Sequence, residues 1–200
     1  MIERLLRQEI EKRWATGKAI IILGPRQVGK TTLLKKICQE KGDFLFLNAD
    51  ETEVTALLEN ANEMRLRQII GRHKVVFLDE AQRIPNVGLT LKIFTDQIPE
   101  VQIVVSGSSS LDLASEINEP LTGRKWEFQM YPISWEELVG QLGFVDARKQ
   151  LEQRLIFGMY PEVINQIGDE REVLKQLSSS YLYRDILQFG NIRKPEALEK

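Results

Sequence analysis

The 200-residue sequence has little cysteine and histidine, and it contains no long apolar run. Its one cysteine, Cys38, cannot form a disulfide within the chain, and the single His73 lacks the companion ligands that a metal site needs. No stretch approaches the roughly 18 apolar residues that cross a bilayer. The charged start MIERLLRQEI does not have the apolar centre of a signal peptide. We therefore expect a cytoplasmic protein that makes no membrane contact.

A strong charge of either sign is also absent. The chain has 27 basic and 29 acidic residues and a net charge of -2, so no overall field attracts it to nucleic acid. Arg65, Arg67, Arg72 and Lys74 could form a local basic patch, although such a cluster is more often a solvated face. Nucleic-acid binding therefore stays open. With 42% hydrophobic and 28% charged residues, the composition fits one globular core with an appendage.

Short apolar runs alternate with helical patterns along the first two thirds of the chain. Nearly continuous apolar runs are typical of parallel strands that helices cover on both faces. Strand signals stop after Tyr131, and Ser134 with Glu137 forms a capping-box pattern. We therefore expect an α/β core over residues 1–132 and a small helical subdomain over 133–200. The predicted strands are 19–23, 44–47, 75–78, 101–105 and 126–130, and the predicted helices are 30–40, 54–70, 89–98, 147–157 and 171–189.

The stretch GPRQVGKT, Gly24 to Thr31, fits the pattern of a phosphate-binding loop in every position. Its glycines let backbone N–H groups turn toward a phosphate, and the following helix adds its positive end. Lys30 can reach the β- and γ-phosphates, and the Thr31 hydroxyl can bind Mg²⁺. The alternative is a strand-to-helix turn without a ligand. The predicted nucleotide-binding residues here are Gly24, Pro25, Arg26, Gln27, Val28, Gly29, Lys30, Thr31 and Thr32.

The stretch VVFLDE is an apolar strand that ends in two carboxylates. Asp79 at the strand end can hold Mg²⁺, and Glu80 can orient or deprotonate the water that attacks the γ-phosphate. The alternative is an acidic strand end on a solvated loop. The sequence has no Asn-Lys-x-Asp motif for guanine, and small-molecule kinases commonly lack the second carboxylate. This pair therefore favours ATP hydrolysis.

Two polar residues follow other predicted strands. Asn48 and Ser106 are expected near the same site, because open parallel sheets bind ligands at the carboxyl ends of their strands. Either side chain could sense the γ-phosphate or restrain Glu80. Equally, both could cap loops and helices.

Several motifs together resemble the bacterial and archaeal AAA-type ATPases of the AAA_14 group, in which a DUF4143 domain follows the ATPase. They are GPRQVGKTTLL, VVFLDEAQRIP, IVVSGSSS, LTGRKWEFQMYPISWEEL, GMYPE and YRDI. The resemblance implies a three-layer P-loop NTPase fold of the additional-strand type with strand order 5-1-4-3-2. It makes Ser106 similar to the first sensor position and Asn48 similar to a polar switch residue.

The same resemblance draws attention to Arg124 in LTGR and, more weakly, to Arg184 in YRDI. A guanidinium at Arg124 could meet the γ-phosphate within one chain or across a subunit boundary. Alternatively, it could pair with a nearby carboxylate and stabilise the fold. Because members of the family continue into a further C-terminal domain, we also expect this sequence to be a fragment.

The sequence thus predicts an Mg²⁺-dependent ATPase that couples its nucleotide state to a helical appendage or a partner. ATP and Mg²⁺ are the expected ligands, and a homo-oligomer or a partner protein is expected to use the nucleotide cycle. One rival is a nucleotide-dependent binding switch with negligible turnover, acting with nucleic acid or a toxin-type partner. Another is a phosphotransferase in which Glu80 activates a small hydroxyl substrate.

Overall fold

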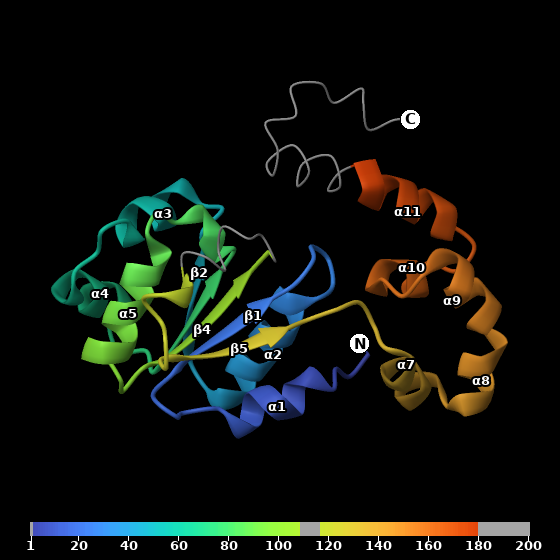
Figure 1. The fold of residues 1–200 in the computed structure, drawn as a ribbon, viewed down its shortest axis with the longest axis horizontal. Coiled ribbons are helices and arrows are strands. Elements are labelled where there is room, and N and C mark those ends of the chain that lie inside the picture. The colour runs from blue at the N-terminus through green and yellow to red at the C-terminus, as the bar shows by residue number, and fades with distance from the viewer. Residues whose placement is uncertain (1, 109–116, 180–200) are drawn as a thin grey trace. The chain divides into compact units, whose positions relative to one another are not determined.

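The computed structural model describes residues 2–108 and 117–179. The chain forms two compact units, residues 1–131 and 132–200 (Figure 1).

The first unit is built on a five-stranded sheet whose strands are all parallel. The order β2-β3-β4-β1-β5 is the predicted order 5-1-4-3-2, which confirms the fold class. Parallel pairing brings the carboxyl ends of all five strands to one edge, where Asn48 lies opposite Asp79 and Ile22 opposite Ser106. The strands are β1 (Ala19–Leu23), β2 (Phe44–Asn48), β3 (Val75–Asp79), β4 (Gln102–Gly107) and β5 (Lys125–Gln129).

Helices cover both faces of this sheet. On one side lie α3 (Thr52–Leu58), α4 (Glu63–Ile70) and α5 (Val87–Gln97), and on the other lie α1 (Leu6–Lys12) and α2 (Lys30–Lys41) (Figure 1). Every residue of β1, β3 and β4 is buried. Alternate strand residues point to opposite faces, so Ile21 and Val105 join the core that contains Phe94 of α5. Such two-sided burial explains why these strands are continuously apolar.

The single helix predicted over 54–70 is wrong, because two helices occupy this range. Asn60 has a left-handed backbone (φ 52°), which ends the helical path after α3. Asn62 then caps α4, and its side chain accepts a hydrogen bond from the backbone N–H of Arg65. The prediction over 147–157 is similarly divided at Gln150, between α8 and α9.

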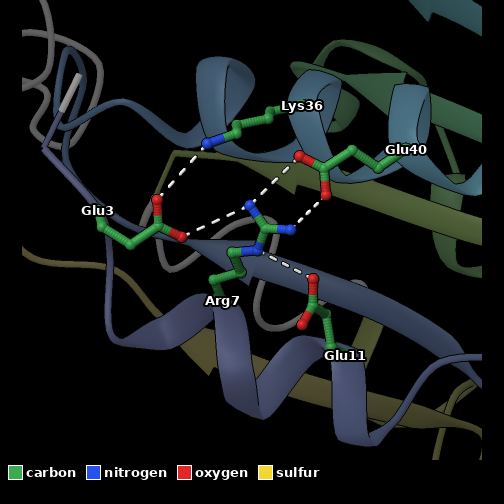
Figure 2. Close-up of polar contacts among 5 residues, drawn as sticks. All are labelled: Glu3, Arg7, Glu11, Lys36 and Glu40. Carbon is green, nitrogen blue, oxygen red and sulfur yellow. Dashed lines mark hydrogen bonds and ion pairs between the residues drawn. The ribbon is translucent and has the colours of Figure 1, made fainter.

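A cluster of ion pairs joins α1 and the residues before it to α2 (Figure 2). Arg7 contacts Glu3, Glu11 and Glu40, and Lys36 lies 3.5 Å from the Glu3 carboxylate. Single exposed ion pairs contribute little stability, whereas one guanidinium shared by three carboxylates restricts several side chains at once. The cluster fixes residues 3–11 beside the helix that follows the predicted phosphate loop.

The second unit is helical in its described part. It contains α7 (Trp135–Leu142), α8 (Phe144–Lys149), α9 (Leu151–Phe157), α10 (Pro161–Asn165) and α11 (Glu170–Leu177). The predicted capping box is present, because Ser134 accepts from the backbone N–H of Glu137 and the Glu137 carboxylate accepts from that of Ser134. Arg154 and Glu170, both buried, form an ion pair of 3.4 Å that joins α9 to α11.

Two predictions concern residues that the structure does not describe. The predicted helix over 171–189 is covered only to residue 179, and Arg184 lies outside the described residues. Over the described ranges, no helix is both long and apolar enough to span a bilayer.

Candidate nucleotide site

The loop Gly24–Gly29 joins β1 to α2 and has a constrained backbone. A Cβ atom at Gly24 would stand 2.2 Å from the carbonyl oxygen of Met130, just after β5, so only glycine permits this approach. Gln27 (φ 59°) and Gly29 (φ 97°) both adopt positive φ values, and Gly29 is the N-cap of α2. This backbone turns the loop at the start of a 12-residue helix. N–H groups at a helix start are ordinary donors to a phosphate.

Lys30 is folded back onto this loop. Its ammonium donates to the carbonyl oxygens of Gly24 and Pro25, each at 2.8 Å, and the residue is only 5% exposed. A buried ammonium needs such acceptors. The predicted phosphate-binding lysine is therefore held against the loop that would receive the phosphates.

Three predicted residues meet at the ends of β3, β4 and the loop. Thr31 Oγ1 donates to Asp79 Oδ1 at 3.1 Å, and the hydroxyl of Ser106 donates to the same oxygen. Asp79 is 7% exposed and Ser106 is fully buried. The structure thus brings together the two predicted metal ligands and one predicted nucleotide sensor.

The Asp79 and Thr31 oxygens fit the preference of Mg²⁺ for hard ligands. Throughout the described chain, no group of three or more His, Cys, Asp or Glu residues could hold a metal ion. Mg²⁺ does not require such a group, because it is commonly held by one or two carboxylates, water and phosphate oxygens. The Thr31 and Asp79 oxygens therefore fit a metal that would be bound together with a nucleotide.

Glu80 directly follows β3 and has a left-handed backbone (φ 54°). For a residue other than glycine this conformation is uncommon, and such outliers cluster at functional sites. Its carboxylate accepts a hydrogen bond from Gln82 Nε2, in the 3₁₀ turn η1 (Ala81–Arg83). The backbone thus turns away from the strand at the residue predicted to act on water.

Asn48 lies at the same sheet edge, but its side chain serves its own loop. Its Oδ1 accepts from the backbone N–H of Asp50 at 3.1 Å, which is an Asx turn. The observed partner of Glu80 is Gln82. The capping role that the sequence left open for Asn48 is therefore the one that the structure contains.

Arg124 lies at the other end of the sheet. Its carbonyl accepts from Ala19 N, at the start of β1, whereas the phosphate loop follows the end of β1. The guanidinium donates to Asp96 at 2.5 Å, and this hydrogen bond raises the pKa of Arg124. The structure therefore does not bring Arg124 to the phosphate loop within one chain, and the pairing with a carboxylate is observed. Contact across a subunit boundary stays a prediction.

The other loop residues vary in exposure. Val28 is fully buried, Pro25 and Arg26 are half-buried, and Gln27 and Thr32 are exposed. The buried Val28 anchors the loop to the core. Gln27 and Thr32 remain accessible at the surface of the unit.

The predicted basic patch is partly neutralised. Arg67 pairs with Glu63 at 2.9 Å and with Glu100 at 2.6 Å, and the hydrogen bond that Arg67 donates to Glu100 raises the pKa of Arg67. Arg65 donates to the carbonyl oxygen of Ala56. These contacts favour the solvated-face interpretation for this part of the patch.

Arg4 is a site residue that the sequence analysis missed. Its guanidinium donates to the carbonyl oxygen of Val28 at 2.7 Å and to that of Tyr131 at 2.5 Å, and the residue is 8% exposed. These contacts span 24 and 127 positions of sequence, so no local pattern could reveal them. Arg4 therefore connects the phosphate loop to the end of the β5 segment.

Gln82 is a second missed residue. It stands in the quoted DEAQ stretch, but only the two acids in that stretch received a predicted role. The structure places its amide between Glu80 and the backbone N–H of Ser108, just after β4. The position of Gln82 inside the DEAQ stretch was the one sequence signal that could have indicated a role for it.

The sheet order and the loop define the first unit as an AAA-type P-loop ATPase fold. The model of the AAA_14 family, described as an AAA domain, matches residues 16–139, so the chain belongs to this family. Residues 148–200 match a second model, a domain of unknown function called DUF8612. The expected association with DUF4143 stays a prediction.

Known relatives are longer than this chain. An uncharacterised protein of Methanocaldococcus jannaschii is 29% identical over 95% of the chain and 46% of its own length. The replication factor C small subunit of Sulfurisphaera tokodaii is 26% identical over 92% of the chain and 57% of its own length. The chain thus spans about half the length of these curated relatives.

A solved structure supports the fold. The Walker-type ATPase of Pyrococcus abyssi is 17% identical and has a TM-score of 0.61, with 94% of this chain and 74% of that chain covered. The likeness at this identity concerns the fold alone. Family and fold together support nucleotide binding and hydrolysis in general.

Proposed function

We propose that the first unit binds ATP with Mg²⁺ and hydrolyses it. The observation that carries this proposal is the shared Asp79 oxygen, to which both Thr31 and Ser106 donate beside the phosphate loop. A hydroxyl and a carboxylate at the end of neighbouring elements are the protein ligands that such a reaction needs. The membership of the AAA_14 family supports the same reaction class.

In this proposal Lys30 and the loop N–H groups bind the triphosphate. Lys30 leaves the carbonyl oxygens of Gly24 and Pro25 and turns to the more strongly attracting phosphate oxygens. Thr31 and Asp79 hold Mg²⁺. When bound, the metal would supply positive charge that offsets the charge developing on the phosphate oxygens.

Glu80 is the proposed catalytic base. It orients the attacking water or accepts its proton, while Ser106 fixes the neighbouring Asp79 through a buried hydroxyl. Positioning and electrostatics supply most of the rate enhancement in phosphoryl transfer. The nucleotide state then acts on the helical unit or on a partner, which we propose as the use of the hydrolysis.

Oligomerisation is part of the proposal only through Arg124. Mixed chains test it: a chain with Arg124→Gln and a chain with Lys30→Ala each lack one required group if Arg124 acts across a boundary. We expect their mixture to release more phosphate than either chain alone. Absence of recovery would leave the ion pair with Asp96 as the role of Arg124.

Single-turnover phosphate release tests the reaction itself. The wild type, Glu80→Gln and Lys30→Ala are compared at equal nucleotide occupancy, with exposed Glu59→Gln as the matched control. We expect Glu80→Gln to lower the rate by about 10²–10⁴-fold, the usual contribution of a catalytic base. Nucleotide affinity should persist in that variant and fall in Lys30→Ala.

Two outcomes would contradict the hydrolysis proposal. Equal phosphate release from the wild type and Glu80→Gln would contradict hydrolysis by this site, and the nucleotide-dependent switch would then be the remaining interpretation. For a switch that acts with nucleic acid, the support is the similarity to the relative named as a replication factor C small subunit. Phosphate transfer only in the presence of a small hydroxyl acceptor would instead indicate the phosphotransferase.

A further inference from the structure

The side chain of Gln82 bridges the end of β3 to the end of β4. Its Nε2 donates to the Glu80 carboxylate at 2.5 Å, and its Oε1 accepts from the backbone N–H of Ser108 at 3.3 Å. Ser108 follows β4 directly, two residues after Ser106. One amide group thus contacts both the proposed base and the strand that carries the proposed sensor.

The orientation of this amide follows from its two neighbours. A backbone N–H can only donate, and an ionised carboxylate can only accept. If the amide were flipped, its N–H₂ would face the Ser108 N–H and its oxygen would face the Glu80 carboxylate. Both contacts would then be repulsive. Gln82 can therefore satisfy both partners in one orientation only.

The backbone around Gln82 restricts where this side chain can go. Glu80 begins the turn η1 in a left-handed conformation, and Ala81 is fully buried. Arg83 is held by Asp50 at 3.2 Å, after which Ile84 is again buried. Because both flanks are fixed, the Glu80 carboxylate and the Gln82 amide are kept on the same side of a tight turn.

We propose that Gln82 is a positioning residue for Glu80 and links its carboxylate to the end of β4. The inference rests on the proposed hydrolysis and adds to it the residue that aims the base. In this role Gln82 does not touch the substrate. It sets the direction of the Glu80 carboxylate. A movement of the backbone at the end of β4 would shift the Gln82 amide and, with it, the Glu80 carboxylate.

A double-mutant cycle tests this role. Gln82→Met has a similar length but neither hydrogen bond, so we expect kcat to fall about 10-fold or more while KM for ATP changes less than two-fold. In a Glu80→Ala background, Gln82→Met should have no further effect on kcat, because its action passes through Glu80. Exposed Gln68→Met is the matched control. An equal further loss in the Glu80→Ala background would overturn the proposal.

Residue-resolved amide exchange of the nucleotide-free chain tests the link without any turnover. Gln82→Met loses both the acceptor for the Ser108 N–H and the donor to Glu80, whereas the exposed control Gln68→Met changes neither contact. We expect Ser108 to exchange faster in Gln82→Met and at the wild-type rate in Gln68→Met. Unchanged Ser108 exchange in Gln82→Met would refute the link to β4.

The two proposals can fail separately. If the wild type releases no more phosphate than Glu80→Ala, the hydrolysis proposal fails. The exchange of Ser108 then still decides whether Gln82 joins the two strand ends. If hydrolysis depends on Glu80 but not on Gln82, only the positioning role fails.

Discussion

Replacing Gly24 with alanine perturbs the phosphate loop at one defined contact. The added methyl group would stand 2.2 Å from the Met130 carbonyl oxygen and 3.1 Å from its carbonyl carbon. Carbon–oxygen contacts in proteins lie at about 3.3–3.6 Å, so the two segments must separate by about 1 Å. Both Met130 atoms that the methyl group would meet belong to the backbone, and therefore no side-chain rotation can relieve the overlap.

The separation has two costs in the free energy of unfolding. Overpacking of this kind costs about 1–3 kcal/mol. In the variant, the neighbouring hydrogen bond from Met130 N to Leu23 O, which is 2.7 Å long in the wild type, would also be strained. Its loss costs about 0.5–1.5 kcal/mol. We therefore expect Gly24→Ala to destabilise the first unit by about 2–4 kcal/mol. Nucleotide affinity should fall as well, because the loop is displaced.

Urea unfolding followed by tryptophan fluorescence measures this change. A Trp135→Phe background restricts the signal to Trp14 and Trp126, which both belong to the first unit. Gly140→Ala, measured in the chain that keeps Trp135, is the control: Gly140 lies in α7 with nothing within 4 Å of an added Cβ, so alanine should be neutral or stabilising there. A change below about 0.5 kcal/mol in Gly24→Ala, the range of ordinary surface substitutions, would refute the argument.

Three further changes probe other parts of the chain. Arg4→Met removes two hydrogen bonds to backbone carbonyl groups, one buried and one partly buried, so it should lower the free energy of unfolding by about 2–4 kcal/mol in the same assay; wild-type stability would contradict this. Burial raises the pKa of the Cys38 thiol to about 12, so the reactive thiolate is scarce at pH 8. Alkylation by iodoacetamide should therefore require denaturant, and rapid modification of the native chain would contradict the burial. Ser134→Ala removes the capping box and should cost about 1 kcal/mol, measured through Trp135 fluorescence; Ser134→Asp should retain most of the stability.

The strands could be predicted because their surroundings are simple. Residues 19–23 and 75–78 are apolar throughout, and the structure buries both faces of these strands. A continuous run needs no alternation to be recognised when helices lie on both sides. The strand order came from the resemblance to a family, since local sequence does not state which strands pair.

The helix boundaries were harder to predict, because the spacing of apolar residues continues unchanged across the point where one helix ends and the next begins. Val54, Leu58, Leu66 and Ile70 are buried and spaced by multiples of four, which a single helix would also give. The left-handed backbone at Asn60 interrupts the helix without changing this spacing. Periodicity therefore indicated helical structure over this range but not the number of helices.

The placement of candidate site residues could be predicted where strand ends determine position. Thr31, Asp79 and Ser106 were expected at one sheet edge, and parallel pairing places them there. Arg124 was taken from a motif, and a motif does not specify the end of the strand at which its side chain lies. The contacts of Arg4 depend on residues 24 and 127 positions away, so they arise only from the folded chain.

The phosphate loop is fixed to the segment after β5 by three separate contacts. Gly24 lies against the Met130 carbonyl, Met130 N donates to Leu23 O, and Arg4 joins Val28 O to Tyr131 O. A displacement of the loop must therefore break one of these contacts or move Met130 and Tyr131 with it. Tyr131 is the last residue of the first unit, so the chain continues into the helical unit directly after these three contacts. A nucleotide-dependent displacement of the loop, as the proposed function requires, would therefore reach Met130 and Tyr131.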